Sequence, residues 1–135
     1  VDRFLYCTLP SGRRLAYPDA EVRKRPTPWG EERPALTYMG VSALAHKWVR
    51  NHAYGGMLVE NITQAVARDI MAEAMIRCEQ SGVFIPILTV HDEIVAEGKP
   101  GLSLNAFDKL IIANPGWADG LPIACDSWCG KRYHK

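Results

Sequence analysis

His91, Asp92 and Glu93 stand between two apolar runs, residues 85–90 and 94–95. Runs of this composition predict buried β-strands, in which an unpaired carboxylate is costly. The two acids therefore need either a turn that reaches water or a cation close by. We expect two short strands folded back on each other, with the acidic residues at the bend.

The longest periodic segment follows Tyr54-Gly55-Gly56 and carries apolar residues at helical spacing. These residues are Ile62, Val66, Ile70, Ala74 and Cys78, with Met71 and Met75 beside them. Ser81-Gly82 supplies a stop signal. The pattern predicts a helix from about Leu58 to Gln80, whose apolar side packs on a sheet.

A polar stripe runs along the same predicted helix. Asn61, Gln64 and Arg68 are three and four residues apart and so share one face. Amide and guanidinium donors suit the minor groove of a DNA duplex, where every base pair offers an acceptor regardless of sequence. A solvated helix face, with Arg68 paired to Asp69 or Glu73, explains the same residues. The helix alone does not separate these two interpretations.

The rest of the chain alternates strand-like and helix-like segments around short turns. The further elements that we expect are a hairpin of residues 4–9 and 15–17, a Pro-rich surface loop over 23–34, a short strand over 35–39, a helix from Ser103 to the Asn114-Pro115 stop, and a final strand over 121–125. This order indicates an α+β fold. We expect one antiparallel sheet, including the hairpin with the acidic motif, packed against one long and one shorter helix.

Composition bounds the class of protein. The chain has 135 residues with 47% hydrophobic content, enough for one ordinary core, so we expect a single domain over 1–135. A formal net charge of +1 provides no global field that attracts nucleic acid. A zinc site of Cys125, Cys129 and His134 lacks the usual pair-and-pair spacing, which favours structural cysteines. The absence of a long apolar run or a signal-like start favours a cytoplasmic protein without a membrane partner.

Several motifs follow one another in an order that carries a resemblance. In chain order they are Leu9-Pro10-Ser11-Gly12-Arg13-Arg14-Leu15, Tyr54-Gly55-Gly56, Leu58-Val59-Glu60-Asn61-Ile62-Thr63-Gln64-Ala65-Val66-Ala67-Arg68-Asp69 and Val90-His91-Asp92-Glu93-Ile94-Val95. Together they resemble the carboxy-terminal palm of family A DNA polymerases, in the bacteriophage-encoded branch of the polymerase I-like family. The resemblance extends over nearly the whole chain.

The resemblance implies a DNA-directed DNA polymerase that uses primer-template DNA and deoxynucleoside triphosphates. Asp92 resembles an aspartate that helps to hold two magnesium ions, which activate the primer 3′-hydroxyl and stabilise the leaving pyrophosphate. Glu93 resembles the neighbouring acid, which acts in the outer shell or through water. His91 resembles a histidine that lies against the primer terminus. These three are the implied catalytic residues.

The implied DNA contacts lie in the long helix and just before it. Gln64 resembles a glutamine that donates to the minor groove near the primer terminus. Asn61, Arg68 and Tyr54 are implied as further DNA-binding residues. If the match to the bacterial relatives is shifted by one position, the roles implied for Glu60 and Asn61 are exchanged.

The chain departs from that family in two respects. Ala53 and Met57 flank the Tyr54-Gly55-Gly56 motif where the branch usually carries Thr and Lys, which implies a weaker grip on the primer. The segments that carry the family's first metal-binding aspartate and its nucleotide-binding Arg and Lys are absent. We therefore expect a fragment of a larger polymerase with only part of the two-magnesium site, inactive by itself and prone to self-association.

Two other functional classes fit some of these residues. A module without catalysis would hold duplex DNA through the polar stripe of the long helix. A metal phosphohydrolase of the His-Asp type would use His91 and Asp92, with His46 and His52 as further ligands. In such enzymes the His-Asp pair lies on a helix, whereas here it lies between two β runs.

Overall fold

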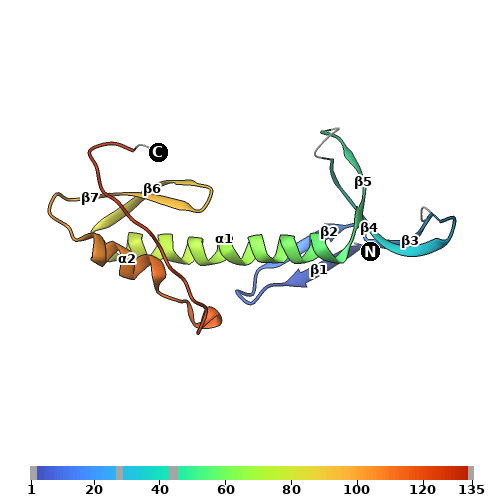
Figure 1. The fold of residues 1–135 in the computed structure, drawn as a ribbon, viewed down its shortest axis with the longest axis horizontal. Helices are drawn as coiled ribbons and strands as arrows, with labels where there is room; N and C mark the ends of the chain where they lie inside the picture. The colour runs from blue at the N-terminus through green and yellow to red at the C-terminus, as the bar shows by residue number, and fades with distance from the viewer. Residues whose placement is uncertain (1–2, 27–28, 43–45, 134–135) are drawn as a thin grey trace. The chain divides into compact units, whose positions relative to one another are not determined.

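The structure is a computed structural model that describes residues 3–26, 29–42 and 46–133 (Figure 1). Its elements in chain order are β1 (Phe4–Thr8), β2 (Arg14–Pro18), β3 (Glu21–Pro26), β4 (Glu32–Val41), β5 (Trp48–Ala53), α1 (Gly55–Ser81), β6 (Phe84–Val90), β7 (Glu93–Gly98), α2 (Leu104–Ile112) and the short 3-10 helix η1 (Gly116–Ala118). The chain divides into two compact units, unit 1 (Val1–Ala65) and unit 2 (Val66–Lys135). Helix α1 begins in unit 1 and ends in unit 2. The two units have α1 in common, so this division does not decide whether they form one domain or two. The single domain over 1–135 therefore stays a prediction.

The strands β1 and β2 form the opening hairpin of unit 1. They pair antiparallel along their whole length. In the turn, the Leu9 N–H donates to the Arg13 carbonyl at 2.8 Å, and the Gly12 N–H donates to the Leu9 carbonyl at 2.9 Å. Gly12 has φ +85°, which only glycine adopts without steric cost. The predicted hairpin is therefore confirmed, with a turn that depends on its glycine.

Unit 1 also contains a three-stranded antiparallel sheet with β4 between β3 and β5. The prediction of a loop over 23–34 is wrong at both ends, because residues 23–26 belong to β3 and residues 32–34 to β4. Pro26 ends its strand, and Pro34 lies where β4 pairs with β3 alone, so neither removes a ladder hydrogen bond that the sheet needs. The segment is nevertheless exposed, as expected. The strand predicted over 35–39 is confirmed within β4.

The core of unit 1 is small. Leu9, Tyr17 and Ala53 are its buried apolar residues among those described. The ring of Tyr17 meets the ring of Tyr38 edge-on, with 5.1 Å between the ring centroids. This contact joins β2 to β4 and holds the opening hairpin against the three-stranded sheet.

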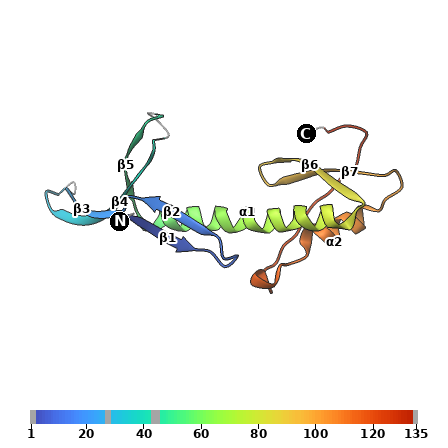
Figure 2. The same ribbon diagram turned by 180° about the vertical axis from the view of Figure 1, so that it is seen from behind.

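Unit 2 is built on the second part of α1, the β6–β7 hairpin and α2 (Figure 2). Met71, Ala74 and Cys78 of α1 are buried together with Phe84 of β6. The ring of Phe84 packs against the ring of Phe107 in α2, at 5.1 Å between centroids. The buried α1 residues repeat at helical spacing, so the apolar stripe read from the sequence is the packed side of the helix. Both predicted helices are confirmed.

Two sequence expectations about the β-structure are corrected. The described strands form three separate sheets of two, three and two strands rather than one sheet. No strand forms over 121–125, where Pro122 cannot donate to a ladder. Asn114 holds this segment by donating from Nδ2 to the Leu121 carbonyl at 2.8 Å. Within the described ranges, no helix is both long and apolar enough to cross a bilayer.

Candidate functional site

His91 and Asp92 connect β6 to β7 in a two-residue turn. The two strands pair antiparallel as far as Val90 opposite Glu93. Such short connections require a positive φ, and His91 adopts φ +52°, a conformation that histidine tolerates better than most residues. His91, Asp92 and Glu93 are all exposed. The acidic residues therefore reach water at a turn, which is one of the two arrangements that the sequence allows.

A β-bulge lies in β6 shortly before this turn. Pro86 is opposite Ala96 and Leu88 is opposite Val95, so Ile87 is an extra residue on its strand. A bulge bends its strand and shifts the side chains beyond it to the other face. It also accommodates Pro86, which cannot donate to the ladder. The bulge therefore helps to set the direction in which the acidic turn points.

The two neighbouring acids differ in their surroundings. The Tyr133 hydroxyl donates to Glu93 Oε2 at 2.8 Å. This hydrogen bond is the main reason that the pKa of Tyr133 is raised, followed by desolvation and by the charge of Glu93. Among the residues that the structure describes, Asp92 takes part in no ion pair. Glu93 is thus oriented by a neutral donor, while Asp92 remains open to solvent.

The acidic turn does not by itself make a magnesium site. Magnesium requires near-octahedral coordination by oxygen ligands. No group of three or more His, Cys, Asp or Glu side chains within residues 3–26, 29–42 and 46–133 is arranged to hold a metal ion. Asp92 and Glu93 supply two carboxylates, one of which is engaged by Tyr133. The described residues therefore do not fit a complete magnesium site.

Within unit 1, the polar stripe of α1 makes hydrogen bonds inside the chain. Asn61 donates from Nδ2 to the Tyr17 hydroxyl at 3.2 Å, and Gln64 donates from Nε2 to Glu60 at 3.2 Å. Asn61 is half-buried, whereas Gln64 is exposed. Asn61 therefore helps to hold the opening hairpin on α1. Gln64 keeps a second amide hydrogen that a ligand can accept.

Arg68 and Tyr54 are the other implied DNA contacts. Arg68, in unit 2, donates from Nη1 to the Thr89 hydroxyl of β6 at 3.5 Å and is exposed. Tyr54 is 66% exposed just before α1, and its carbonyl accepts the Leu58 N–H at 3.1 Å. Gln64 and Asp92 belong to different units, so their expected proximity stays a prediction.

The described residues proposed for other metal sites, among them His46 and His52, are exposed. Cys125 and Cys129 are free and exposed, and His134 lies outside the described residues. Desolvation, with the Asp108 carboxylate next in size, raises the pKa of the Cys125 thiol, which disfavours the thiolate that zinc binds. The His91-Asp92 pair lies on a turn between strands and not on a helix. The structure thus offers no support for the zinc or phosphohydrolase interpretations.

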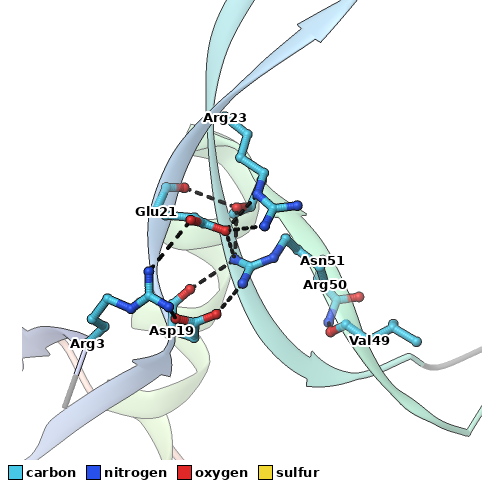
Figure 3. Close-up of polar contacts among 8 residues, drawn as sticks. Arg3, Asp19, Glu21, Arg23, Val49, Arg50 and Asn51 are labelled. Carbon is cyan, nitrogen blue, oxygen red and sulfur yellow. Dashed lines mark hydrogen bonds and ion pairs between the residues drawn. The ribbon is translucent and has the colours of Figure 1, made fainter. Parts of the chain in front are cut away.

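Sequence reasoning missed a second charged cluster, which lies in unit 1 (Figure 3). Arg50 of β5 forms an ion pair and hydrogen bond with Asp19, and its Nη1 lies 3.0 Å from Glu21 Oε1. The fully buried Thr37 hydroxyl accepts from Arg50 Nη1 at 3.2 Å and donates to the Glu21 carbonyl at 3.0 Å. These groups satisfy one another. The cluster is therefore a structural network and not an open site.

The sequence also contained no local signal for the pairing of Tyr133 with Glu93. The two residues lie 40 positions apart. Tyr133 is in a tail without regular secondary structure, so no periodicity relates it to β7.

The fold and the site define a small α+β protein with an exposed acidic turn between β6 and β7. This chain is 43% identical to a protein named DNA polymerase from Bacillus phage SP02, over 136 aligned residues that cover 97% of the chain. The chain spans 20% of the length of that relative. No family model matches the chain. No solved structure matches it either.

Proposed function

We propose that this chain is the carboxy-terminal palm segment of a DNA-directed DNA polymerase of family A, of the kind that bacteriophages encode. The single observation that carries the proposal is the 43% identity over 97% of the chain to the phage DNA polymerase. The α+β fold and the exposed acidic turn between β6 and β7 agree with it. We keep the cytoplasm as the proposed location on the sequence argument alone.

In this proposal Asp92 contributes one carboxylate to the magnesium site of the whole enzyme, and Glu93 stands beside it in an outer position. The remaining ligands come from parts of the polymerase outside this chain, since the described residues do not complete the site. His91 faces the primer terminus from the same turn. The location of Asp92 on an exposed turn supports this assignment, because a ligand completed by other segments must be reachable by them.

The proposed DNA contacts are Gln64, Asn61, Arg68 and Tyr54. Gln64 and Arg68 are exposed on α1, and the tyrosine ring is exposed just before it. Their donors suit the acceptors of the minor groove. Asn61 is the least available of the four, because it is half-buried against the opening hairpin. Primer-template DNA and deoxynucleoside triphosphates are the partners and substrates that this function requires.

The experiment that tests the proposal is Asp92→Asn in the full-length protein that contains this chain. Loss of a metal ligand should lower single-turnover primer extension at least about 100-fold, since even outer-shell partners of metal sites are worth 10–100-fold. Affinity for primer-template DNA should be unchanged. The matched control is Asp119→Asn, which alters another exposed aspartate of unit 2 and should extend primers at the normal rate. Normal extension by the Asp92→Asn enzyme would refute the metal-ligand role.

A second candidate function is duplex DNA binding without catalysis by the isolated chain. It is favoured by the exposed side chains of Gln64 and Arg68 on α1, whose donors suit the minor groove. Under either function the purified 135-residue chain should fail to extend a primer. The full-length protein distinguishes the two functions. Asp92→Asn should abolish primer extension only if the chain is part of a polymerase. Gln64→Ala should weaken DNA binding in both cases, with Gln80→Ala near the end of α1 as the matched control.

We further propose that the isolated chain self-associates through β6. Ile85, Ile87 and Leu88 of this strand are 55%, 53% and 43% exposed, although it belongs to a sheet of only two strands. Two-stranded sheets are marginally stable in water, and exposed apolar surface favours association. A second copy of the chain is the occupant that we expect. Light scattering that shows a monomer at high protein concentration would contradict this expectation.

A further inference from the structure

The carboxy-terminal tail of unit 2 has almost no regular secondary structure, yet it is tied down at intervals. Asn114, just before η1, donates from Nδ2 to the carbonyl of Leu121, just after it, at 2.8 Å. Further along, the Ser127 hydroxyl donates to Asp108 Oδ1 of α2 at 2.6 Å. The last hydrogen bond in the described part of the tail runs from the Tyr133 hydroxyl to Glu93. Figures 1 and 2 show the tail passing from η1 back toward the β6–β7 hairpin.

The position of Tyr133 is also constrained from a second side. Its ring lies 6.3 Å from the Trp128 ring, at an interplanar angle of 34°. The tyrosine is therefore held by an aromatic neighbour and by a hydrogen bond at the same time. Ordering a tail without helix or strand costs conformational entropy, which such paired contacts must offset. The hydrogen bond places the phenol at the acidic turn, and the Trp128 ring supports it from within the tail.

We propose that Tyr133 is a positioning residue for the acidic turn: its hydroxyl holds the Glu93 carboxylate beside Asp92, so that the carboxy-terminal tail forms part of the same site. This inference rests on the proposed polymerase function only for its effect on catalysis. The contact itself is a property of this chain.

The chemistry of the donor explains why a tyrosine suits this place. A hydrogen bond to an ionised acceptor is stronger than one between neutral groups, so a single phenol restricts the rotamers of an exposed glutamate. Lysine or arginine would also orient Glu93, but either would cancel its charge. A neutral donor leaves the negative charge at the turn available to a cation. The tail therefore orients the acid without neutralising it.

The first test uses this chain and does not depend on its function. Carbon-13 labelling of the tyrosine rings follows the titration of each phenol by NMR, with Tyr133→Phe used to assign the Tyr133 signal. Tyr133 should titrate above the ordinary tyrosine pKa, and Glu93→Ala should bring its titration back to that value. Identical titration of Tyr133 with and without Glu93 would overturn the inference.

The second test measures the consequence for catalysis in the full-length protein. Tyr133→Phe should lower kcat about three- to ten-fold, the value of one hydrogen bond, with the KM for nucleotide unchanged. The loss should vanish when Glu93 is already Ala, because Tyr133 then has no carboxylate to position. Tyr6→Phe is the matched control and should be normal. Additive losses in the double variant would show that Tyr133 acts elsewhere and would overturn the inference.

The two proposals fail in different ways. If Tyr133 titrates as expected while Asp92→Asn extends primers normally, the tail contact stands and the polymerase assignment falls. If Asp92→Asn is inactive while Tyr133 titrates like a free tyrosine, the polymerase assignment stands and the positioning role falls.

Discussion

Two clusters of charge in this chain are built in opposite ways. In unit 1, the carboxylates of Asp19 and Glu21 are both paired with Arg50, whose side chain is only 18% exposed (Figure 3). In unit 2, Asp92 and Glu93 stand on an exposed turn, and no cation pairs with either among the residues that the structure describes. The first cluster is neutralised within the chain, whereas the second keeps its negative charge.

The difference separates a structural role from the functional role that we propose for the acidic turn. Charged groups that are partly buried must be paired and hydrogen-bonded, so the unit 1 cluster fixes the sheet and has no capacity left for a ligand. Acids that stay unpaired on a turn contribute little to folding. Their negative charge remains available to a partner from outside the chain. The sequence motif that resembles a polymerase lies at the second kind of cluster.

The largest loss of stability that we expect is that of Arg50→Ala, which removes the shared cation of the unit 1 cluster. The change leaves Asp19, Glu21 and the buried Thr37 without their common donor. Loss of such charge-assisted bonds should lower the local free energy of unfolding by about 2–3 kcal/mol, less than for a fully buried pair because the carboxylates are partly exposed. Amide hydrogen exchange across β3, β4 and β5 measures this local stability.

The control for that prediction is Arg33→Ala in the same sheet. Arg33 pairs with Glu31 at 3.3 Å, but both side chains are about 70% exposed. Exposed pairs are worth little, so the change should stay below about 0.5 kcal/mol. Equal losses for Arg50→Ala and Arg33→Ala would mean that the unit 1 cluster is not structural and would remove the contrast with unit 2.

The sequence predicted those parts of the fold that local patterns encode. The helix α1 was predictable because its apolar residues repeat at helical spacing, and the β1–β2 hairpin because Pro10 and Gly12 mark a turn. The strand β5 was not predicted, because the consecutive polar residues Arg50, Asn51 and His52 carry no apolar alternation. In the folded chain Arg50 pairs with Asp19 and Glu21, which lie about 30 positions earlier in the sequence. No local pattern indicates that such a charged residue belongs to a strand.

The turn at the candidate site was predictable from the sequence, but the surroundings of its acids were not. The acids between two apolar runs require a turn, and a turn is present at His91 and Asp92. The neighbour of Glu93 was not predictable, because Tyr133 reaches it through an irregular tail. Contacts of this kind depend on the whole path of the chain, which no local periodicity records.

The second prediction separates the two clusters by alkaline pH. The pKa of Tyr133 is raised in the folded chain, so the contribution of its contact is fully present below the ordinary tyrosine pKa of about 10 and is lost as the pH rises through the raised value. The arginines of unit 1 stay charged in this range. Raising the pH should therefore release the end of the tail around Tyr133 and leave the β3–β5 sheet intact. NMR shifts of the Trp128 indole and of Thr37 report the two regions.

The control for this pH effect is Tyr133→Phe, which has no titrating phenol at the tail. Its Trp128 signal should already be that of the released tail near neutral pH and should not change further. A transition of equal size in Tyr133→Phe would show that another group drives the release.

The smallest expected effect is that of Asp92→Asn on stability, and it sharpens the comparison most. Asp92 is exposed and forms no ion pair among the described residues, so the free energy of unfolding should change by less than about 0.5 kcal/mol. Asp19→Asn, the matched change in unit 1, removes the charge that pairs with Arg3 at 2.7 Å and with Arg50, and should cost about 1–2 kcal/mol. Denaturant unfolding of both variants measures the difference. A large loss of stability in Asp92→Asn would mean that the turn acid supports the fold, and its exposure would then no longer argue for a ligand from outside the chain.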